Sequence, residues 1–478
     1  MTGRGSALLA FSNLSLGVLS VGVQMKIGMV RPYPKTMCCC ICLLLYCTHT
    51  SWYIQCSNHE DDRNGKDNTC ETGGPCSEKG VVLLIGTEWT SNKSNLEVVV
   101  NNRELAKAIA QRGFKVYCTV LNIQDEDISL AAKENVDLVV PTSDDMSSSA
   151  SRQQVILNPE KYYPSLKELD HVQFVVSHAF INGTARMALR IRDKLFRKAK
   201  LITIFYYIPE DEDLPPSRLQ AHQEEMESWA AKADLVLSLG PNIFNYFTNK
   251  FRIFEDINHH LLLPFMTTDK FDQSVFKNRN ISTFVEILTF HSDMLIREDK
   301  FHQFDLPARI IGDTCRNRSC ETKLRWKILG VNDDVYVTFR DHLNQIVKNA
   351  DVKINFYPPH SLGKIYDDLI QCHIVLYTGE NSFGLPALLA ASAGVPLITS
   401  ENTGFSSFLK EHNFVYFTHS MLSNNRDLPT DRIKNVIQEY DEMLKVARNI
   451  QTFLQKCAVD GPIARSQDIF YAWLEDNY

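Results

Sequence analysis

The feature that most constrains this chain is a series of short, wholly apolar segments that alternate with helix-like segments from residue 80 onward. Residues 81–86 form the first apolar segment, and apolar positions then recur at helical spacing over 97–112 until Gly113. Strands that are apolar on both faces are typical of parallel sheets covered by helices. The alternation therefore predicts an α/β fold with doubly wound sheets.

The alternation runs through the chain twice, which predicts two Rossmann-like domains at 80–265 and 281–478, joined by a connection at 266–280. The further strands expected are 114–121, 136–140, 172–177, 199–207, 233–239, 260–265, 283–289, 325–329, 352–356, 372–377 and 395–399. The further helices expected are 184–197, 220–232, 242–249, 301–311, 362–371, 385–393, 431–453 and 463–474. In such folds ligands bind at the carboxyl ends of the strands, so an interdomain cleft is the expected site.

The N-terminal part differs in composition. An apolar run at 37–47 follows three basic residues, and eight of the 13 cysteines precede residue 77. This pattern predicts a targeting or membrane-anchor segment at 1–56 and a polar stem or linker at 57–79. The expected location is the secretory pathway, membrane-anchored or secreted, with a cytoplasmic protein as the alternative. Four N-glycosylation sequons are compatible with that route; they begin at Asn92, Asn182, Asn280 and Asn317. Cys315 and Cys320 could form a disulfide in an oxidising compartment, and the sequence leaves open whether they do.

The net charge of the chain and the spacing of its acidic and histidine residues limit which ligands it can bind. The formal net charge of -7 and a pI near 6.1 argue against nucleic acid, because binding the phosphate backbone needs clustered Lys and Arg. The acidic stretch 210–213 and the pair His259-His260 lack further ligands at metal-binding spacing. We therefore expect neither a metal nor a cofactor.

The most informative segment is 383–404, which begins Phe-Gly-Leu-Pro-Ala-Leu-Leu-Ala-Ala-Ser-Ala-Gly-Val-Pro. Gly384 permits close backbone approach to a ligand, and the helix from Leu385 directs its N-terminal amides toward an anion. This segment resembles the donor motif of the retaining GT-B glycosyltransferases (glycogen-synthase-like, glycosyl transferases group 1), Glu-Pro-Phe-Gly-Leu-x-x-x-Glu-Ala-x-Ala-x-Gly-x-Pro-Val. The resemblance implies a GT-B arrangement, a nucleoside-diphosphate-sugar donor and an unidentified acceptor.

The motif is degenerate at its functional positions. The family's first glutamate, which contacts the donor sugar, falls on Asn381 with Glu380 one place earlier, and the second, which holds the ribose, falls on Leu389. Leucine accepts no hydrogen bond, so that contact is lost. The donor-binding candidates carried over from the family within this segment are Glu380, Asn381, Phe383, Gly384 and Leu385.

Three other family elements are altered as well. Where the family has Gly-Arg and a later Lys that grip the diphosphate, this chain offers His291 or Ser292, and Lys300. The first loop, 87–95, lacks the family's glycine pair and is expected to be a closed surface loop. Tyr206 stands where the family has a histidine, and His178 ends a strand at the expected cleft.

Two hypotheses follow. One is a glycosyltransferase that transfers sugar with retention and is impaired or inactive. The other is a non-catalytic GT-B-fold binding or regulatory module. No catalytic residue can be assigned from the sequence, because no nucleophile, base and orienting group occur together.

Overall fold

The structure is a computed structural model that describes residues 79–90, 96–142, 149–179, 183–211, 215–265, 281, 284–292, 295–316, 323–348, 350–379, 382–412 and 430–478. The expected targeting segment 1–56, nearly all of the stem and the connection 266–280 lie outside these residues, as do the four sequon asparagines and Cys320. The secretory destination therefore stays a prediction. In the part of the chain that is described, no helix is both long and apolar enough to cross a membrane.

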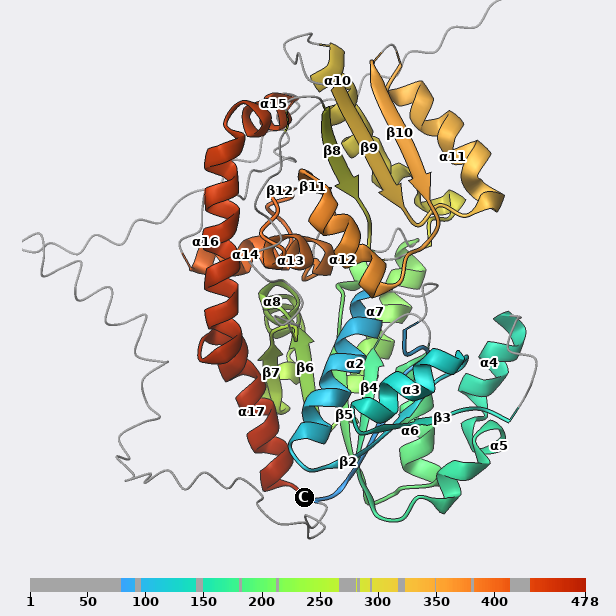
Figure 1. The fold of residues 1–478 in the computed structure, drawn as a ribbon. Helices are drawn as coiled ribbons and strands as arrows, with labels where there is room; N and C mark the ends of the chain where they lie inside the picture. Colours follow the sequence, from blue (N-terminus) through green and yellow to red (C-terminus); the bar gives the residue numbers. More distant parts are fainter. Residues whose placement is uncertain are drawn as a thin grey trace, which may run out of the picture. The chain divides into compact units, whose positions relative to one another are not determined.

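The first half of the described chain forms a seven-stranded parallel sheet in the order β3-β2-β1-β4-β5-β6-β7 (Figure 1). Its strands are β1 (Val81–Ile85), β2 (Lys115–Thr119), β3 (Val136–Val139), β4 (Val172–Ala179), β5 (Lys200–Phe205), β6 (Leu235–Leu239) and β7 (His259–Leu262). Because β1 is central, four of its five residues are buried. This confirms the inference from the apolar runs that the sheet is covered on both faces.

The second half forms a five-stranded parallel sheet in the order β10-β9-β8-β11-β12. Its strands are β8 (Phe284–Thr289), β9 (Lys323–Leu329), β10 (Val352–Tyr357), β11 (Ile374–Tyr377) and β12 (Leu397–Thr399). The expectation of an α/β fold with two parallel sheets is confirmed. All strands of each sheet point the same way, so each sheet has one edge where the loops after the strands gather.

Helices connect the strands. In the first half they are α2 (Leu96–Gln111), α3 (Asp125–Lys133), α4 (Ser149–Leu157), α5 (Pro159–Tyr162), α6 (Thr184–Lys194), α7 (Pro216–Ala230), α8 (Pro241–Lys250) and α9 (Ile253–Asp256). In the second half they are α10 (Asp305–Arg316), α11 (Asp333–Ile346), α12 (Leu362–Gln371), α13 (Leu385–Ser392), α14 (Gly404–Glu411), α15 (Thr430–Gln438), α16 (Tyr440–Val459) and α17 (Pro462–Asp476). The described residues also include the 3₁₀ helices η1 (Pro164–Glu168), η2 (Pro209–Asp211) and η5 (Glu298–Phe304).

Two expectations about helices were wrong. The helix expected at 431–453 is two helices, α15 and α16, which separate at Glu439, and the helix expected at 301–311 begins as η5 before α10 takes over at Asp305. The separation at Glu439 has no Gly or Pro to mark it, so periodicity alone does not reveal it.

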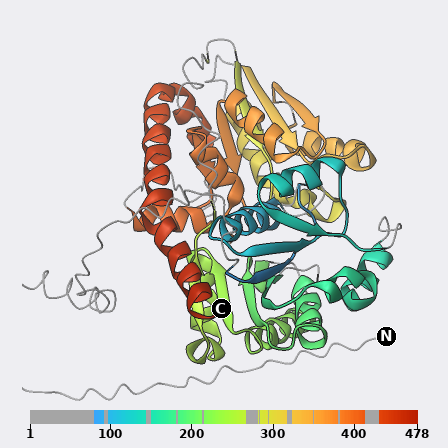
Figure 2. The same cartoon turned by 60° about the horizontal axis from the view of Figure 1, so that its bottom comes forward.

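The last two helices fasten the two halves together. On α16, the Gln451 side chain donates from Nε2 to the carbonyl of Ser392 at the end of α13, 2.8 Å away. On α17, the Ser466 hydroxyl accepts from the amide of Leu263, just past β7, at 3.1 Å. Figures 1 and 2 show α16 and α17 running along both halves to the C terminus. Residues 74–478 accordingly cluster as one compact unit.

Candidate functional site

The loops at the carboxyl ends of the two sheets touch each other directly. The Leu96 amide at the start of α2 donates to the carbonyl of Ser292, in the loop after β8, at 2.6 Å. The Asn242 side chain at the start of α8 donates to the carbonyl of Asn402, in the loop after β12, at 2.8 Å. These contacts bring together the edges where ligands bind in parallel α/β sheets.

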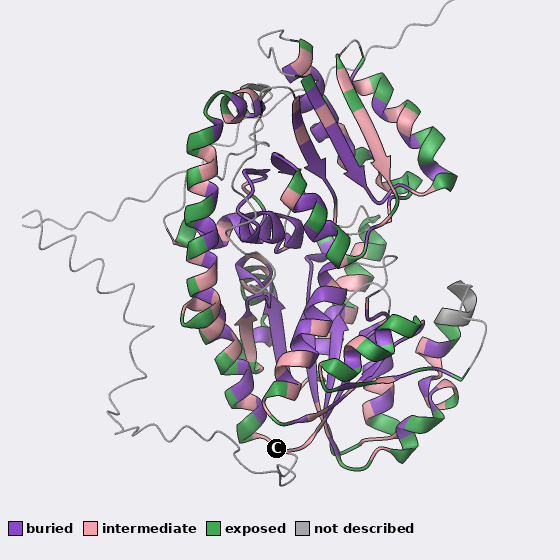
Figure 3. Ribbon diagram, viewed as in Figure 1, coloured by how far each residue is buried: buried purple, intermediate pink, exposed green. Residues whose placement is uncertain are grey.

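The donor-motif residues lie at this junction. Gly384 precedes α13 in the left-handed conformation at φ 86°, and Phe383 and Leu385 beside it are each 1% exposed. All eight residues of α13 are buried, which Figure 3 shows as purple along the whole helix. The amides of Gly404 and Phe405 donate to the carbonyls of Ser382 and Phe383, so the first turn of α14 fixes this loop.

Phe383 also packs against the first half of the chain. A Cβ added to Gly240, in the loop between β6 and α8, would lie 2.5 Å from the Phe383 ring. Gly240 has a φ of 90°, which side-chain-bearing residues rarely adopt. The Phe383 ring therefore depends on a glycine that the sequence marked only as a break before Pro241.

His291 lies near the donor motif, and Tyr377 links the two. The His291 ring is 5.8 Å from the ring of Tyr377 at the end of β11, and a Cβ on Gly384 would meet Tyr377 at 3.1 Å. His291 also packs against Phe304 of η5 at 5.0 Å between ring centroids. Lys300 lies on the same 3₁₀ helix and is half-buried. The structure thus brings His291 together with the donor motif and puts Lys300 on the adjoining element.

A carboxylate occupies the first turn of α2 at the same junction. Glu97 is 3% exposed, and its Oε2 lies 3.4 Å from the Ser292 hydroxyl, which donates to it. Desolvation, with the Glu97 charge as a second cause, raises the pKa of Tyr206. The Glu97 carboxylate therefore interacts with both Tyr206 and Ser292. It occupies a helix N-terminus, which would otherwise favour an external anion.

His178 and Tyr206 form one buried network at the edge of the first sheet. His178 Nδ1 is 2.7 Å from the Tyr206 hydroxyl, and its Nε2 is 2.7 Å from Oδ1 of Asn102 on α2. Burial lowers the pKa of His178 to about 3, so the imidazole is neutral. Both rings are inside the protein, so in this structure they position Asn102 and α2 and do not face solvent.

Comparison with known proteins identifies the family. A family model described as family 4 glycosyltransferase in conflict systems matches residues 83–461. The chain belongs to this glycosyltransferase family. No curated protein matches the chain in sequence.

Solved structures with the same fold include several glycosyltransferases. A sucrose-phosphate synthase from Thermosynechococcus elongatus is 12% identical with a TM-score of 0.64, covering 83% of this chain and 99% of that one. Anabaena HepE in complex with UDP and glucose is 14% identical with a TM-score of 0.56, covering 83% of this chain and 100% of that one. S. aureus TarM, solved with UDP, is 10% identical with a TM-score of 0.56, covering 83% and 99%. These likenesses confirm the GT-B fold expected from the donor motif.

The ribose position of the donor motif is apolar in this glycosyltransferase. Leu389, which occupies it, is 5% exposed within the apolar core, whereas Glu380 and Asn381 lie outside the described residues.

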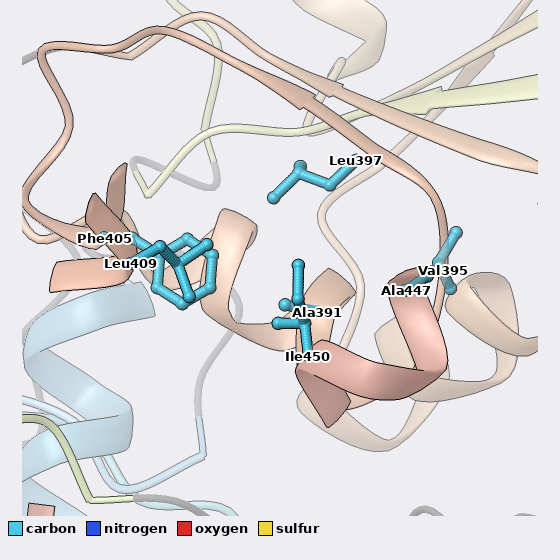
Figure 4. Close-up of a pocket in the computed structure, with 7 residues that line it drawn as sticks. All are labelled: Ala391, Val395, Leu397, Phe405, Leu409, Ala447 and Ile450. Carbon is cyan, nitrogen blue, oxygen red and sulfur yellow. The ribbon is translucent and has the colours of Figure 1, made fainter. Parts of the chain in front are cut away.

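An apolar cavity of about 10 Å³ lies against α13. It is lined by Ala391, Val395, Leu397, Phe405, Leu409, Ala447 and Ile450 (Figure 4). It holds at most one water-sized molecule and is too small for a nucleotide, which needs hundreds of Å³.

The first part of the loop after β1 is buried, whereas the sequence predicted a surface loop. Glu88 and Trp89 are 4% and 1% exposed, so this part of the loop is buried; Asn92 lies outside the described residues. The sequence motifs identified neither Glu97 nor Asn102 as a site residue. Only their position indicates a role, because both belong to the helix that follows the first strand.

Proposed function

We propose that this chain is a glycosyltransferase for a nucleoside-diphosphate sugar whose diphosphate position is closed by the protein's own groups, so that transfer is impaired. The family match supports the reaction class, and the degenerate motif supports the impairment. Where transfer occurs, it proceeds with retention, as the resemblance to retaining enzymes implies. UDP is the first nucleotide to test, because HepE and TarM are solved with UDP.

The contact of Leu96 and Glu97 with Ser292 carries the proposal. In the resembling enzymes the first loop and the loop after the first strand of the second domain hold the diphosphate between them. In this chain the start of α2, which directly follows the first loop, bonds to the loop after β8. The Leu96 amide donates to the Ser292 carbonyl, and the Ser292 hydroxyl donates to the Glu97 carboxylate. A diphosphate must displace this contact and approach a buried carboxylate, which opposes its binding.

The catalytic groups that stabilise a departing diphosphate are reduced as well. Removing one preorganised donor or cation from such a site commonly costs about 2.7–4 kcal/mol in the barrier. Histidine is a weaker cation than arginine near pH 7, so Lys300 is left as the lysine of the adjoining helix η5, beside the acidic Glu298 and Asp299. We therefore expect slow turnover.

The second candidate, a binding or regulatory module, is favoured by the complete burial of α13. Every residue of that helix packs in the interior, and such a helix is retained for core density whether or not a ligand binds. Transfer activity discriminates between the two candidates.

The test uses the full chain with UDP, GDP and ADP, recording heat and melting temperature, followed by incubation with UDP-hexoses. Impaired transfer predicts nucleotide-dependent stabilisation with slow release of sugar whose anomeric configuration, read by NMR, matches the donor. Stabilisation without any sugar release supports the module. Absence of stabilisation by all three nucleotides at millimolar concentration overturns the proposed function.

A further inference from the structure

The aromatic ring of Tyr377 lies between two elements that the resemblance assigns to the donor. Tyr377 ends β11, is 2% exposed and belongs to the same apolar core as α13. Gly384, which precedes α13, lies beside one edge of the ring. The His291 ring, at the family's diphosphate position, lies 5.8 Å away between ring centroids. A side chain of the protein therefore fills the space where these two elements meet.

Two glycines make room for the Tyr377 ring. A Cβ added to Gly379 would clash with the Tyr377 hydroxyl, and a Cβ added to Gly384 would lie 3.1 Å from Cε1 of the same ring. The ring is thus in close contact with the backbone at both residues. Such an approach requires residues without a side chain, so the ring is closely packed where it lies.

The two glycines bracket the sugar end of the donor motif. Asn381, at the position that contacts the donor sugar in the resembling family, comes between them in the sequence and lies outside the described residues. The ribose position, Leu389, comes five residues after Gly384, or about 7.5 Å along α13. The Tyr377 ring is therefore beside the sugar end of the motif and away from its nucleoside end.

The burial of the ring decides between two roles that a tyrosine has beside a sugar. A ring that stacks on a sugar presents one open face to it, whereas the Tyr377 ring is 2% exposed and covered on its sides by glycine backbone and His291. A buried ring occupies space that a hexose would otherwise enter. We propose that Tyr377 excludes the donor sugar, so that the chain binds a nucleoside diphosphate more tightly than the corresponding nucleoside-diphosphate hexose.

This assignment rests on the proposed function and makes it more specific. The contact of Glu97 with Ser292 opposes the diphosphate, whereas the Tyr377 ring opposes the sugar that the diphosphate carries. Specificity of this kind comes from a clash with the disfavoured ligand. A hexose enters only when the Tyr377 ring moves, and that movement disturbs a close-packed core, which agrees with slow transfer.

The test titrates the full chain with UDP and with UDP-glucose by isothermal titration calorimetry. UDP-glucose is the probe because HepE is also solved with it. The unmodified chain should bind UDP at least about 10-fold more tightly than UDP-glucose. Tyr377→Ala should raise the affinity for UDP-glucose at least about 10-fold and change the affinity for UDP less. A residue that only supports the fold would not raise an affinity when it is removed.

Two control variants separate the ring from other effects. Tyr377→Phe keeps the ring and removes only the hydroxyl, so it should keep the preference for UDP. Tyr357→Ala is the matched control, because Tyr357 ends β10 of the same sheet as Tyr377 ends β11; it should also keep the preference. Circular dichroism and the melting temperature show which variants fold.

Each outcome decides. Equal affinity of the unmodified chain for UDP and UDP-glucose overturns the role of Tyr377 and leaves the proposed function standing. This comparison needs no variant, so it holds even where Tyr377→Ala fails to fold. An unchanged affinity of folded Tyr377→Ala for UDP-glucose also overturns that role alone. Absence of binding by UDP, GDP and ADP alike overturns both proposals.

Discussion

Replacing the buried carboxylate at the first turn of α2 should open the diphosphate position. In Glu97→Gln the Ser292 hydroxyl loses a charged acceptor and the site loses its negative charge. The carboxylate lies 3.4 Å from the Ser292 hydroxyl, and the hydroxyl and carbonyl oxygens of one serine are about 3 Å apart. A phosphate oxygen that takes the place of the Ser292 carbonyl on the Leu96 amide would thus lie at most about 6 Å from Glu97.

At about 6 Å and an effective dielectric constant of about 20, repulsion between two unit charges is about 3 kcal/mol, or roughly 100-fold in affinity. The glutamine also gives up a favourable charge at the helix N-terminus, which should lower the stability of the variant by about 0.3–1 kcal/mol. We expect Glu97→Gln to bind UDP about 10- to 100-fold more tightly than the unmodified chain, measured by isothermal titration calorimetry.

The matched control is Glu126→Gln, which removes an exposed carboxylate from the first turn of α3 and should leave UDP affinity unchanged. Circular dichroism and the melting temperature establish that both variants fold. An affinity of folded Glu97→Gln equal to or below that of the unmodified chain would refute the reasoning, because the carboxylate would then not oppose the anion.

Three further results are expected. The pKa of His178 is about 6.5 in the unfolded chain and about 3 in the folded chain. Its contribution to the free energy of unfolding is therefore complete above pH 6.5 and falls by up to about 1.4 kcal/mol per pH unit toward pH 3. Urea titrations of His178→Asn should show a weaker dependence of this free energy on pH, and an unchanged dependence counts against a buried neutral ring. Gly240→Ala should lower the melting temperature through strain against Phe383, whereas Gly363→Ala, with open space around it, should not; equal melting temperatures would contradict the close packing. Lys300→Met should weaken UDP binding about 10-fold at low salt and less at high salt, and a salt-independent effect would exclude a charge contact.

Much of the fold could be predicted because burial follows the apolar pattern. Both parallel sheets and the helix after Gly384 follow from apolar runs and glycine positions. The helix α11 also has an apolar pattern that marks it as a helix, since Val335, Phe339 and Leu343 are buried at four-residue spacing. By contrast, α3 exposes Ile128 at 56%, so it presents little apolar periodicity to detect.

The site was only partly predictable, because its contacts join distant residues. The sequence identified the loop after β8 and the donor helix, yet Glu97 and Ser292 are 195 positions apart and meet only when both sheets are in place. Local periodicity encodes which face of an element is buried and carries no information on which loops meet.

A crystal structure of the full chain with UDP tests directly whether the protein's own groups close the diphosphate position. UDP should bind with its phosphates between the N-terminus of α13 and the Ser292 loop, and the hydrogen bond from the Leu96 amide to the Ser292 carbonyl should be broken. UDP bound elsewhere, or bound there with that hydrogen bond intact, would contradict the proposed function.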